Sequence, residues 1–109
     1  MLLTVKHRLL LLGTLANVQG NLTELRILRE LREALAFSEE DHKEFNIRPG
    51  EPGTPKDGKI FWNEGKPKEV EIGDVAKRII VKKLKELDNQ GLLSDDHLEI
   101  VEKFPEVEV

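Results

Sequence analysis

Hydrophobic positions recur along most of this chain at the spacing of an α-helix, which predicts a mostly helical fold. The clearest helix begins after Asn21, whose side chain can cap it while Glu24 completes a capping box. Its apolar stripe consists of three leucines about one turn apart, Leu28, Leu31 and Leu35. The charged positions between them predict a surface helix that packs one face inward.

A second strong helical period predicts a long helix from Asp74 to about Asn89. Gly91 follows as a left-handed terminator, with Leu92 and Leu93 expected to pack back under the helix end. The apolar face of this helix is expected to carry Ala76, Ile80, Leu84 and Leu87.

Three further helices are predicted from weaker patterns. The first begins after Thr4 and is apolar most of the way round, which favours a central place in the core; a strand over residues 1–5 is the competing interpretation. Another begins at Ser38 with acids in its first turn. The last follows a Ser94 cap and stops at Pro105.

A loop and two short strands are predicted between the third and fourth helices. Residues 48–58 contain three Pro and three Gly, which indicates a mobile loop. Residues 59–62 and 68–72 are predicted to form an antiparallel hairpin, with Gly65 accepting positive φ in the turn between them. The prediction is therefore an α+β, mostly α fold of about five helices with one β-hairpin between the third and fourth.

Length and cysteine content narrow the class of protein. The chain has 109 residues, which predicts one compact domain over residues 1–109, with residues 106–109 as a tail. It has no Cys, which excludes a disulfide framework, a thiolate nucleophile and Cys-ligated metal sites.

The net charge of −4 argues against a general nucleic-acid binder, but the charges are unevenly distributed. Residues 77–85 hold five positive charges and no acid, whereas residues 95–108 hold six acids and one Lys. On a helix, Arg78, Lys82 and Lys85 lie together opposite the apolar face. This stripe is interpreted as a solvated helix face, as a contact for an acidic protein, or as a contact for phosphates.

Trp62 is the residue predicted to contact a partner most directly. It is adjacent to Phe61, so the two rings point to opposite faces of a strand. An exposed Trp is a strong interface anchor. The alternative is that it covers its own hairpin and a helix.

Three helices followed by a hairpin also fit the element order of a winged-helix domain. In the DNA-binding form of that domain, the helix before the wing enters the major groove. Here that helix, residues 38–45, has four acids against one Lys, so phosphates would repel it. A winged-helix-like shape used for protein contacts remains open.

No catalytic or metal-binding pattern is present in the sequence. His7, His42 and His97 lie in separate segments, and no nucleophile or phosphate-binding motif occurs. We therefore expect a protein that is not an enzyme and has no cofactor or metal.

The N-terminal segment outlines a signal peptide only roughly. Lys6 and Arg8 precede four leucines, but Gly13 interrupts the short apolar stretch. No apolar run approaches the ~18 residues that a membrane-spanning helix needs. We therefore expect a cytoplasmic protein with no membrane partner.

Several fragments resemble small proteins of unassigned function encoded by bacteriophages and prophages. The fragments are the leucines 9–12, Leu28-Arg29-Glu30-Leu31-Arg32, Phe37-Ser38-Glu39-Glu40, Trp62-Asn63, Glu71-Ile72-Gly73, residues 84–88 and Phe104. The resemblance covers most of the chain and brings no catalytic residues. It implies a viral origin, and therefore action in a host cytoplasm.

The function predicted first is a non-enzymatic protein-binding module, which acts on a host or phage protein or in phage assembly. Self-association is a further expectation, because the apolar content of the first helix (Leu2, Leu3, Leu10 and Leu11) exceeds what one small core needs. The alternative is a nucleic-acid-binding accessory protein that uses Arg78, Lys82 and Lys85, with Trp62 stacked on a base.

Overall fold

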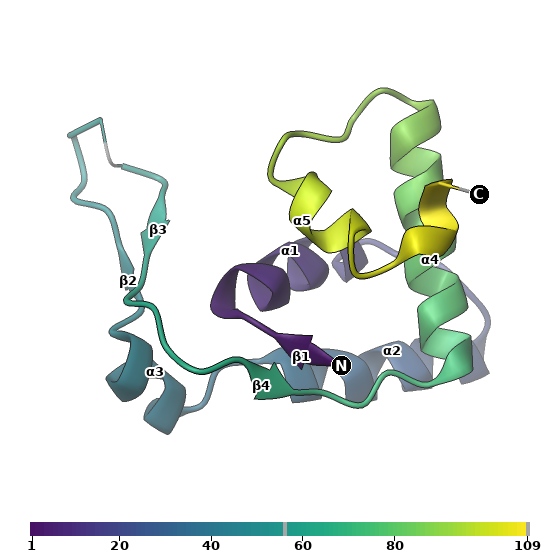
Figure 1. The fold of residues 1–109 in the computed structure, drawn as a ribbon, viewed down its shortest axis with the longest axis horizontal. Coiled ribbons are helices and arrows are strands. Elements are labelled where there is room, and N and C mark those ends of the chain that lie inside the picture. Colours follow the sequence, from purple (N-terminus) through teal and green to yellow (C-terminus); the bar gives the residue numbers. More distant parts are fainter. Residues whose placement is uncertain (56, 109) are drawn as a thin grey trace.

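The computed structural model describes residues 1–55 and 57–108, and its fold is α+β and mostly helical, as predicted (Figure 1). Lys56 of the predicted loop and Val109 of the predicted tail lie outside the described residues. Within the described part, five α-helices follow one another: α1 (Val5–Leu15), α2 (Leu22–Leu35), α3 (Glu39–Phe45), α4 (Asp74–Asn89) and α5 (His97–Val101). The short elements are β1 (Leu2–Leu3), β2 (Arg48–Pro49), β3 (Ile60–Phe61), β4 (Lys68–Glu69) and the 3-10 helix η1 (Pro105–Glu108).

The first three helices each begin with a capping box. Thr4, Asn21 and Ser38 accept a hydrogen bond from the backbone N–H three residues further on. The side chain of that third residue accepts one from the backbone N–H of the cap in return. Two N–H groups at each helix start are thereby satisfied, which confirms the three helix starts predicted from the sequence. The N-terminal segment forms both a strand and a helix, the two structures that the sequence offered there, because β1 lies directly before Thr4 and α1 directly after it.

A hairpin lies between α3 and α4 as predicted, but its strands are not the predicted pair. β3 pairs with β2 across the Pro/Gly-rich segment, with Arg48 opposite Phe61 and Pro49 opposite Ile60. β4 was predicted to pair with the strand before it, and it pairs instead with β1 as a second antiparallel sheet.

The connection between β3 and β4 explains this pairing. It runs beside α3, where the Asn63 N–H donates to the Phe45 carbonyl over 2.6 Å and Gly65 lies against the Phe45 ring. The chain then continues from this contact to the N-terminal segment. Pairing there places Leu3 and Val70 in the core, where both are buried.

Gly65 is required for this close approach and not, as predicted, for a positive φ. The glycines with positive φ are Gly53, Gly58 and Gly91. A Cβ atom at residue 65 would lie 2.4 Å from Cε1 of Phe45, closer than such atoms approach in folded proteins. The Phe45 ring is buried and has little room to move.

We therefore expect Gly65→Ala to destabilise the packing of the chain on α3 by about 1–3 kcal/mol. Hydrogen exchange of the Asn63 amide should accelerate, while the amides of α1 and α4 should keep their protection. Gly13→Ala is the matched control, because a Cβ atom there meets nothing within 4 Å inside a helix. That control is expected to be neutral or slightly stabilising. Unchanged exchange at Asn63 in Gly65→Ala would contradict the prediction.

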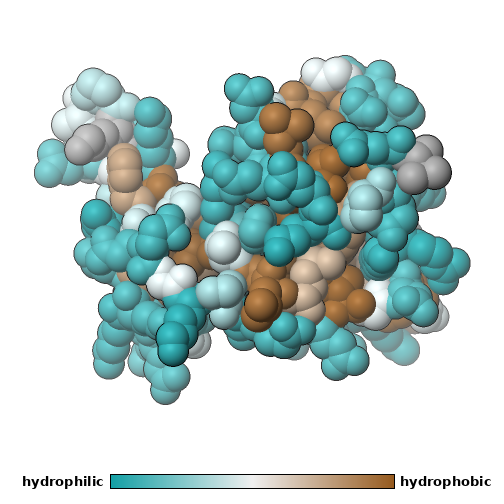
Figure 2. Space-filling view, viewed as in Figure 1, coloured by the Kyte–Doolittle hydropathy of each residue, from teal (hydrophilic) through white to brown (hydrophobic). Residues whose placement is uncertain are grey.

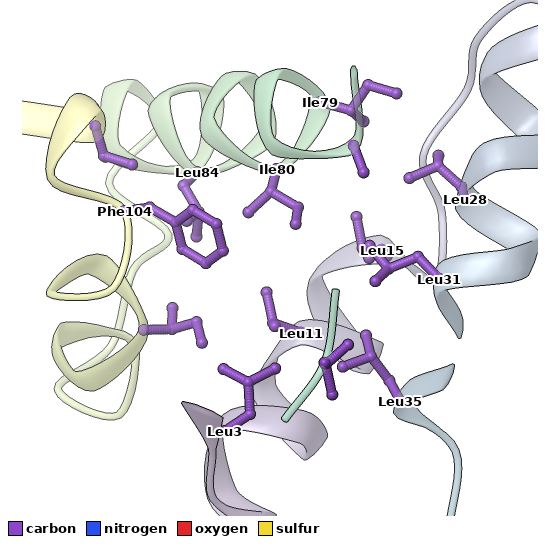
Figure 3. Close-up of a cluster of buried hydrophobic side chains, with 14 of the residues drawn as sticks. Leu3, Leu11, Leu15, Leu28, Leu31, Leu35, Ile79, Ile80, Leu84 and Phe104 are labelled. Atoms are coloured by element: carbon purple, nitrogen blue, oxygen red, sulfur yellow. The ribbon is translucent and has the colours of Figure 1, made fainter. Parts of the chain in front are cut away.

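The core is an apolar cluster that joins α1, α2, α4, α5 and η1 (Figure 3). Helix α1 packs against α2, α4 and α5, which agrees with its predicted central place. On α4, Ala76, Ile80 and Leu84 are buried as predicted, together with Ile79, and Leu87 is partly buried. No helix among the described residues has both the length and the apolar character needed to cross a membrane.

The C-terminal segment differs from its prediction. The last α-helix covers only His97–Val101, and no side-chain cap from Ser94 starts it. Residues 105–108, expected as a stop and a tail, form η1, which packs against α4 and buries Val107. The α-helix already ends at Val101, and Pro105 instead begins η1, because its fixed φ suits the first turn of a helix.

The end of α4 is formed largely as predicted. Gly91 has φ +68°, and the Leu92 N–H returns to the Leu87 carbonyl over 2.8 Å. These features are those of a left-handed helix terminator. Leu93 packs against the core, but Leu92 is exposed and does not pack back as expected.

The apolar excess that suggested self-association is mostly used by the core. Leu3 and Leu11 are fully buried, and Leu10 packs against the same cluster. Of the four leucines, only Leu2 is largely exposed, at 51%. These leucines therefore offer less exposed apolar surface for self-association than the sequence predicted.

Helix α3 and the β2–β3 hairpin project from one side of the helical body (Figure 1). We call this part, residues 39–55 and 57–61, the arm. Its distal segment forms turns, with the Gly50 N–H donating to the Lys59 carbonyl over 2.8 Å. Most residues of α3 are exposed and polar, and Figure 2 shows the base of the arm as a hydrophilic surface.

Candidate functional site

Helix α4 places the three predicted basic residues on one outward face. Gly73 precedes the helix. The negative charge of Asp74, in the first turn, interacts favourably with the positive end of the helix dipole. Because Ile80 and Leu84 are held in the core, the opposite side of the helix faces solvent. Arg78 and Lys82 are exposed there, and Lys85 is partly exposed.

A groove follows this face of α4. Its volume is about 620 Å³, and Arg78, Lys82 and Lys85 all line it. Val81, partly buried between them, adds an apolar contact surface. The residues predicted as a stripe therefore lie together in a concave surface and not on a plain helix exterior.

The wall of the groove comes from the segment that the sequence predicted as a tail. Glu106 of η1 lines the groove, and its Oε1 is 2.7 Å from Nζ of Lys77. The hydrogen bond from Lys77 holds the pKa of the Glu106 carboxyl below its ordinary value. This contact joins η1 to α4. In the sequence, the only sign that this segment packs on the fold is the apolar Val107 between two acids.

The uneven charge along the sequence is partly neutralised in the fold. Lys77 pairs with Glu106, and Lys6 of α1 lies 3.2 Å from Asp96 and 3.1 Å from Glu99. By contrast, neither Arg78 nor Lys82 has an ion-pair partner within the described part of the chain. Arg78 and Lys82 therefore leave positive charge available in the groove.

Trp62, the predicted contact residue, does not belong to this groove. It directly follows β3, in the arm side of the molecule, whereas α4 lies on the other side of the body (Figure 1). Its side chain is half-buried. The structure thus brings the three basic residues together and leaves Trp62 apart from them.

The arrangement of helices also differs from the winged-helix prediction. The body is built from α1, α2 and α4, while α3 stands in the arm. Helix α3 therefore does not take the place of a recognition helix packed on two others.

Arg8 carries a structural role that sequence reasoning missed. Its side chain is only 1% exposed and crosses from α1 to the junction of α2 and α3. There it donates to the carbonyls of Leu35 (3.1 Å) and Ala36 (2.7 Å) and to Oδ2 of Asp41 (3.0 Å). The guanidinium carbon also lies 4.1 Å from the centre of the Phe37 ring. We call this set of contacts the Arg8 latch.

The latch shifts the titration of Asp41. Burial by itself raises the pKa of this carboxyl, but hydrogen bonds from the Ser38 N–H and from Arg8 outweigh it and lower the pKa. The same carboxylate therefore closes the capping box of α3 and binds the guanidinium. It joins the start of the arm to the core helix α1.

The three histidines are used locally and in separate places. His7 belongs to the α1 capping box, and burial and the nearby Lys103 lower its pKa. His42 lies edge-on to the Phe37 ring, and His97 contacts Ser94. No group of three or more His, Asp or Glu side chains positioned to hold a metal ion occurs among the residues that the structure describes.

Comparison with known proteins finds no relative of this chain. No family model, no curated protein and no solved structure matches this chain.

Proposed function

We propose that this protein is a non-enzymatic protein-binding module, and that its α4 groove binds an acidic segment of a protein partner. The observation that supports this most directly is the placement of Arg78, Lys82 and Lys85 around Val81 in one groove. In the viral setting implied by the phage resemblance, the partner would be a host or phage protein in the cytoplasm.

The dimensions of the groove suit a polypeptide. Its lining residues extend from Asp74 to Asn89, which corresponds to about 22 Å along a helix axis. That length exceeds what a small metabolite would span. An extended or helical segment could place acidic side chains against the basic residues and an apolar side chain against Val81.

The acids around the groove favour a protein over a nucleic acid. Asp74, Glu86 and Glu106 also line it, and a continuous row of phosphates would meet them unfavourably. A peptide has only some acidic positions and can place neutral or basic residues opposite these carboxylates. This mixed charge pattern provides selectivity as well as attraction.

A displayed library of random peptides, selected on the purified protein, tests the proposal. We expect enrichment of sequences that combine Asp or Glu with a large apolar residue. Lys82→Glu should weaken the enriched peptides about tenfold, because it places a like charge opposite their acids. Lys66→Glu, the same charge change at an exposed position between β3 and β4, lies outside both the groove and α3, so it is the matched control and should leave their affinity unchanged.

Two outcomes would overturn the proposal. One is a selection that yields no acidic peptide sensitive to Lys82→Glu. The other is that single-stranded DNA at low salt binds more tightly than the peptides and loses affinity in Lys82→Glu, which would assign the groove to phosphates.

A further inference from the structure

The arm presents an acidic, convex surface at the side of the molecule away from the groove. On α3, Glu39, Glu40 and Glu44 are exposed, and Lys43 is the one lysine among its seven residues. The groove lies on α4, across the helical body (Figure 1). Because α3 and α4 lie on opposite sides of the body, the arm of a chain does not reach its own groove (Figure 1).

The charges of the arm and of the groove are complementary in sign and in spacing. Glu40 and Glu44 are four residues apart on α3, and Arg78 and Lys82 are four residues apart on α4. Residues at this spacing lie on one helix face, about 6 Å apart along the axis. Two acids of one helix can therefore face two cations of another at the same time.

The arm is held in place before any binding. The Arg8 latch fixes the start of α3 to α1 through Asp41, and Gly65 packs on Phe45 at its end. A projecting element that is already ordered loses little conformational freedom when it docks. The acidic face of α3 thus meets the requirements of a preformed ligand.

We propose that the groove of one chain takes the arm of a second copy, so that copies associate head to tail. This inference rests on the proposed function, since it names the acidic segment that the same groove binds. The contact is heterologous, with different surfaces on the two copies. Repetition of it generates either a closed ring or an open filament.

Sedimentation velocity of the purified protein at low salt, over a range of concentrations, tests the inference. We expect the weight-average mass to rise with concentration and to fall when salt is added, because exposed ion pairs are screened. The arm variant Glu40→Gln/Glu44→Gln and the groove variant Arg78→Gln/Lys82→Gln should each weaken association about tenfold, since each exposed pair changes a binding constant roughly 1.5- to 5-fold. Glu30→Gln/Glu33→Gln, on exposed positions of α2, is the matched control and should associate like the unmodified protein.

Mixing the arm variant with the groove variant tests whether the arm of one copy contacts the groove of another, and wild-type species larger than a dimer show that this contact is head-to-tail. The groove variant still has a native arm, and the arm variant still has a native groove. One copy of each should therefore form a dimer that cannot extend further. At a concentration at which each variant alone is monomeric, the mixture should show a dimer and no larger species.

The results that would overturn the inference differ from those that would overturn the proposed function. A wild-type monomer at every concentration and salt would exclude the head-to-tail contact, while peptide selection could still support the groove as a binding site. Association that persists in both variants would place the contact elsewhere. A mixture that stays monomeric under conditions where the wild type associates would also contradict the inference.

Discussion

Replacement of Arg8 by Met is expected to lower the free energy of unfolding by about 3 kcal/mol, the range found when a buried ion pair loses one partner. Methionine keeps much of the side-chain volume, so the effect comes from lost polar contacts and not from a cavity. The carbonyls of Leu35 and Ala36 lose their donor, and the Asp41 carboxylate loses its counterion. An unsatisfied buried group costs about 1–3 kcal/mol.

The loss should be greatest in the arm. Trp62 is the only tryptophan of the chain and directly follows β3, so its fluorescence reports on that region. In urea, the fluorescence transition of Arg8→Met should precede the loss of helical circular dichroism, whereas we expect the two transitions to coincide in the unmodified protein. Lys6→Met on the same helix is the control, because its ion pairs with Asp96 and Glu99 are exposed and contribute little to stability. If Arg8→Met and Lys6→Met lowered the free energy of unfolding equally, the proposed role of the Arg8 latch in stability would be wrong.

The same variant should change the acid dependence of stability. The pKa of Asp41 in the folded protein lies below its ordinary value of 3.8, so the folded state holds this proton less tightly than the unfolded state. The stabilisation that the Asp41 carboxylate contributes is therefore fully present above its ordinary pKa, and it is lost as the pH falls through the lower pKa of the folded state. Without Arg8 the pKa of Asp41 moves up, and the difference in stability between the two proteins should narrow in acid.

The features that could be predicted from the sequence are those fixed by near neighbours. The caps at Thr4, Asn21 and Ser38 involve contacts over three residues, and the Gly91 terminator closes a single turn. The same holds for the stripe of Arg78, Lys82 and Lys85, because helical geometry alone places these residues together. Local chemistry therefore located the helices and three residues of the groove.

The features that could not be predicted depend on contacts between distant segments. β1 and β4 are more than sixty residues apart, and two-residue strands carry too little pattern to choose a partner. Arg8 looked like an ordinary charge at the start of an apolar helix, and its partners lie 27 to 33 residues further along. The groove wall was missed for the same reason, since Glu106 is placed by the packing of η1 on α4.

Replacement of Phe104 by Ala tests this long-range part of the fold and is expected to have the largest effect. The ring is fully buried among residues of α4, α5 and α1 (Figure 3). Removal of a buried Phe side chain costs about 3–5 kcal/mol, because apolar contacts are lost and a cavity remains. Such a loss is a large fraction of the ~5–15 kcal/mol that stabilises a typical domain.

The substitution should also disturb the groove. Phe104 directly precedes η1, so a cavity at this position loosens the segment that carries Glu106 to Lys77. Urea unfolding measures the loss of stability, and the amide and side-chain NMR signals of Lys77 report the loss of the ion pair. Phe104→Leu should cost only about 1–2 kcal/mol and keep that pair, because it fills most of the space. Leu98→Ala, at a residue that is 60% exposed on α5, should have little effect on either. An unfolding free energy in Phe104→Ala close to that of Leu98→Ala would show that the C-terminal segment does not belong to the core.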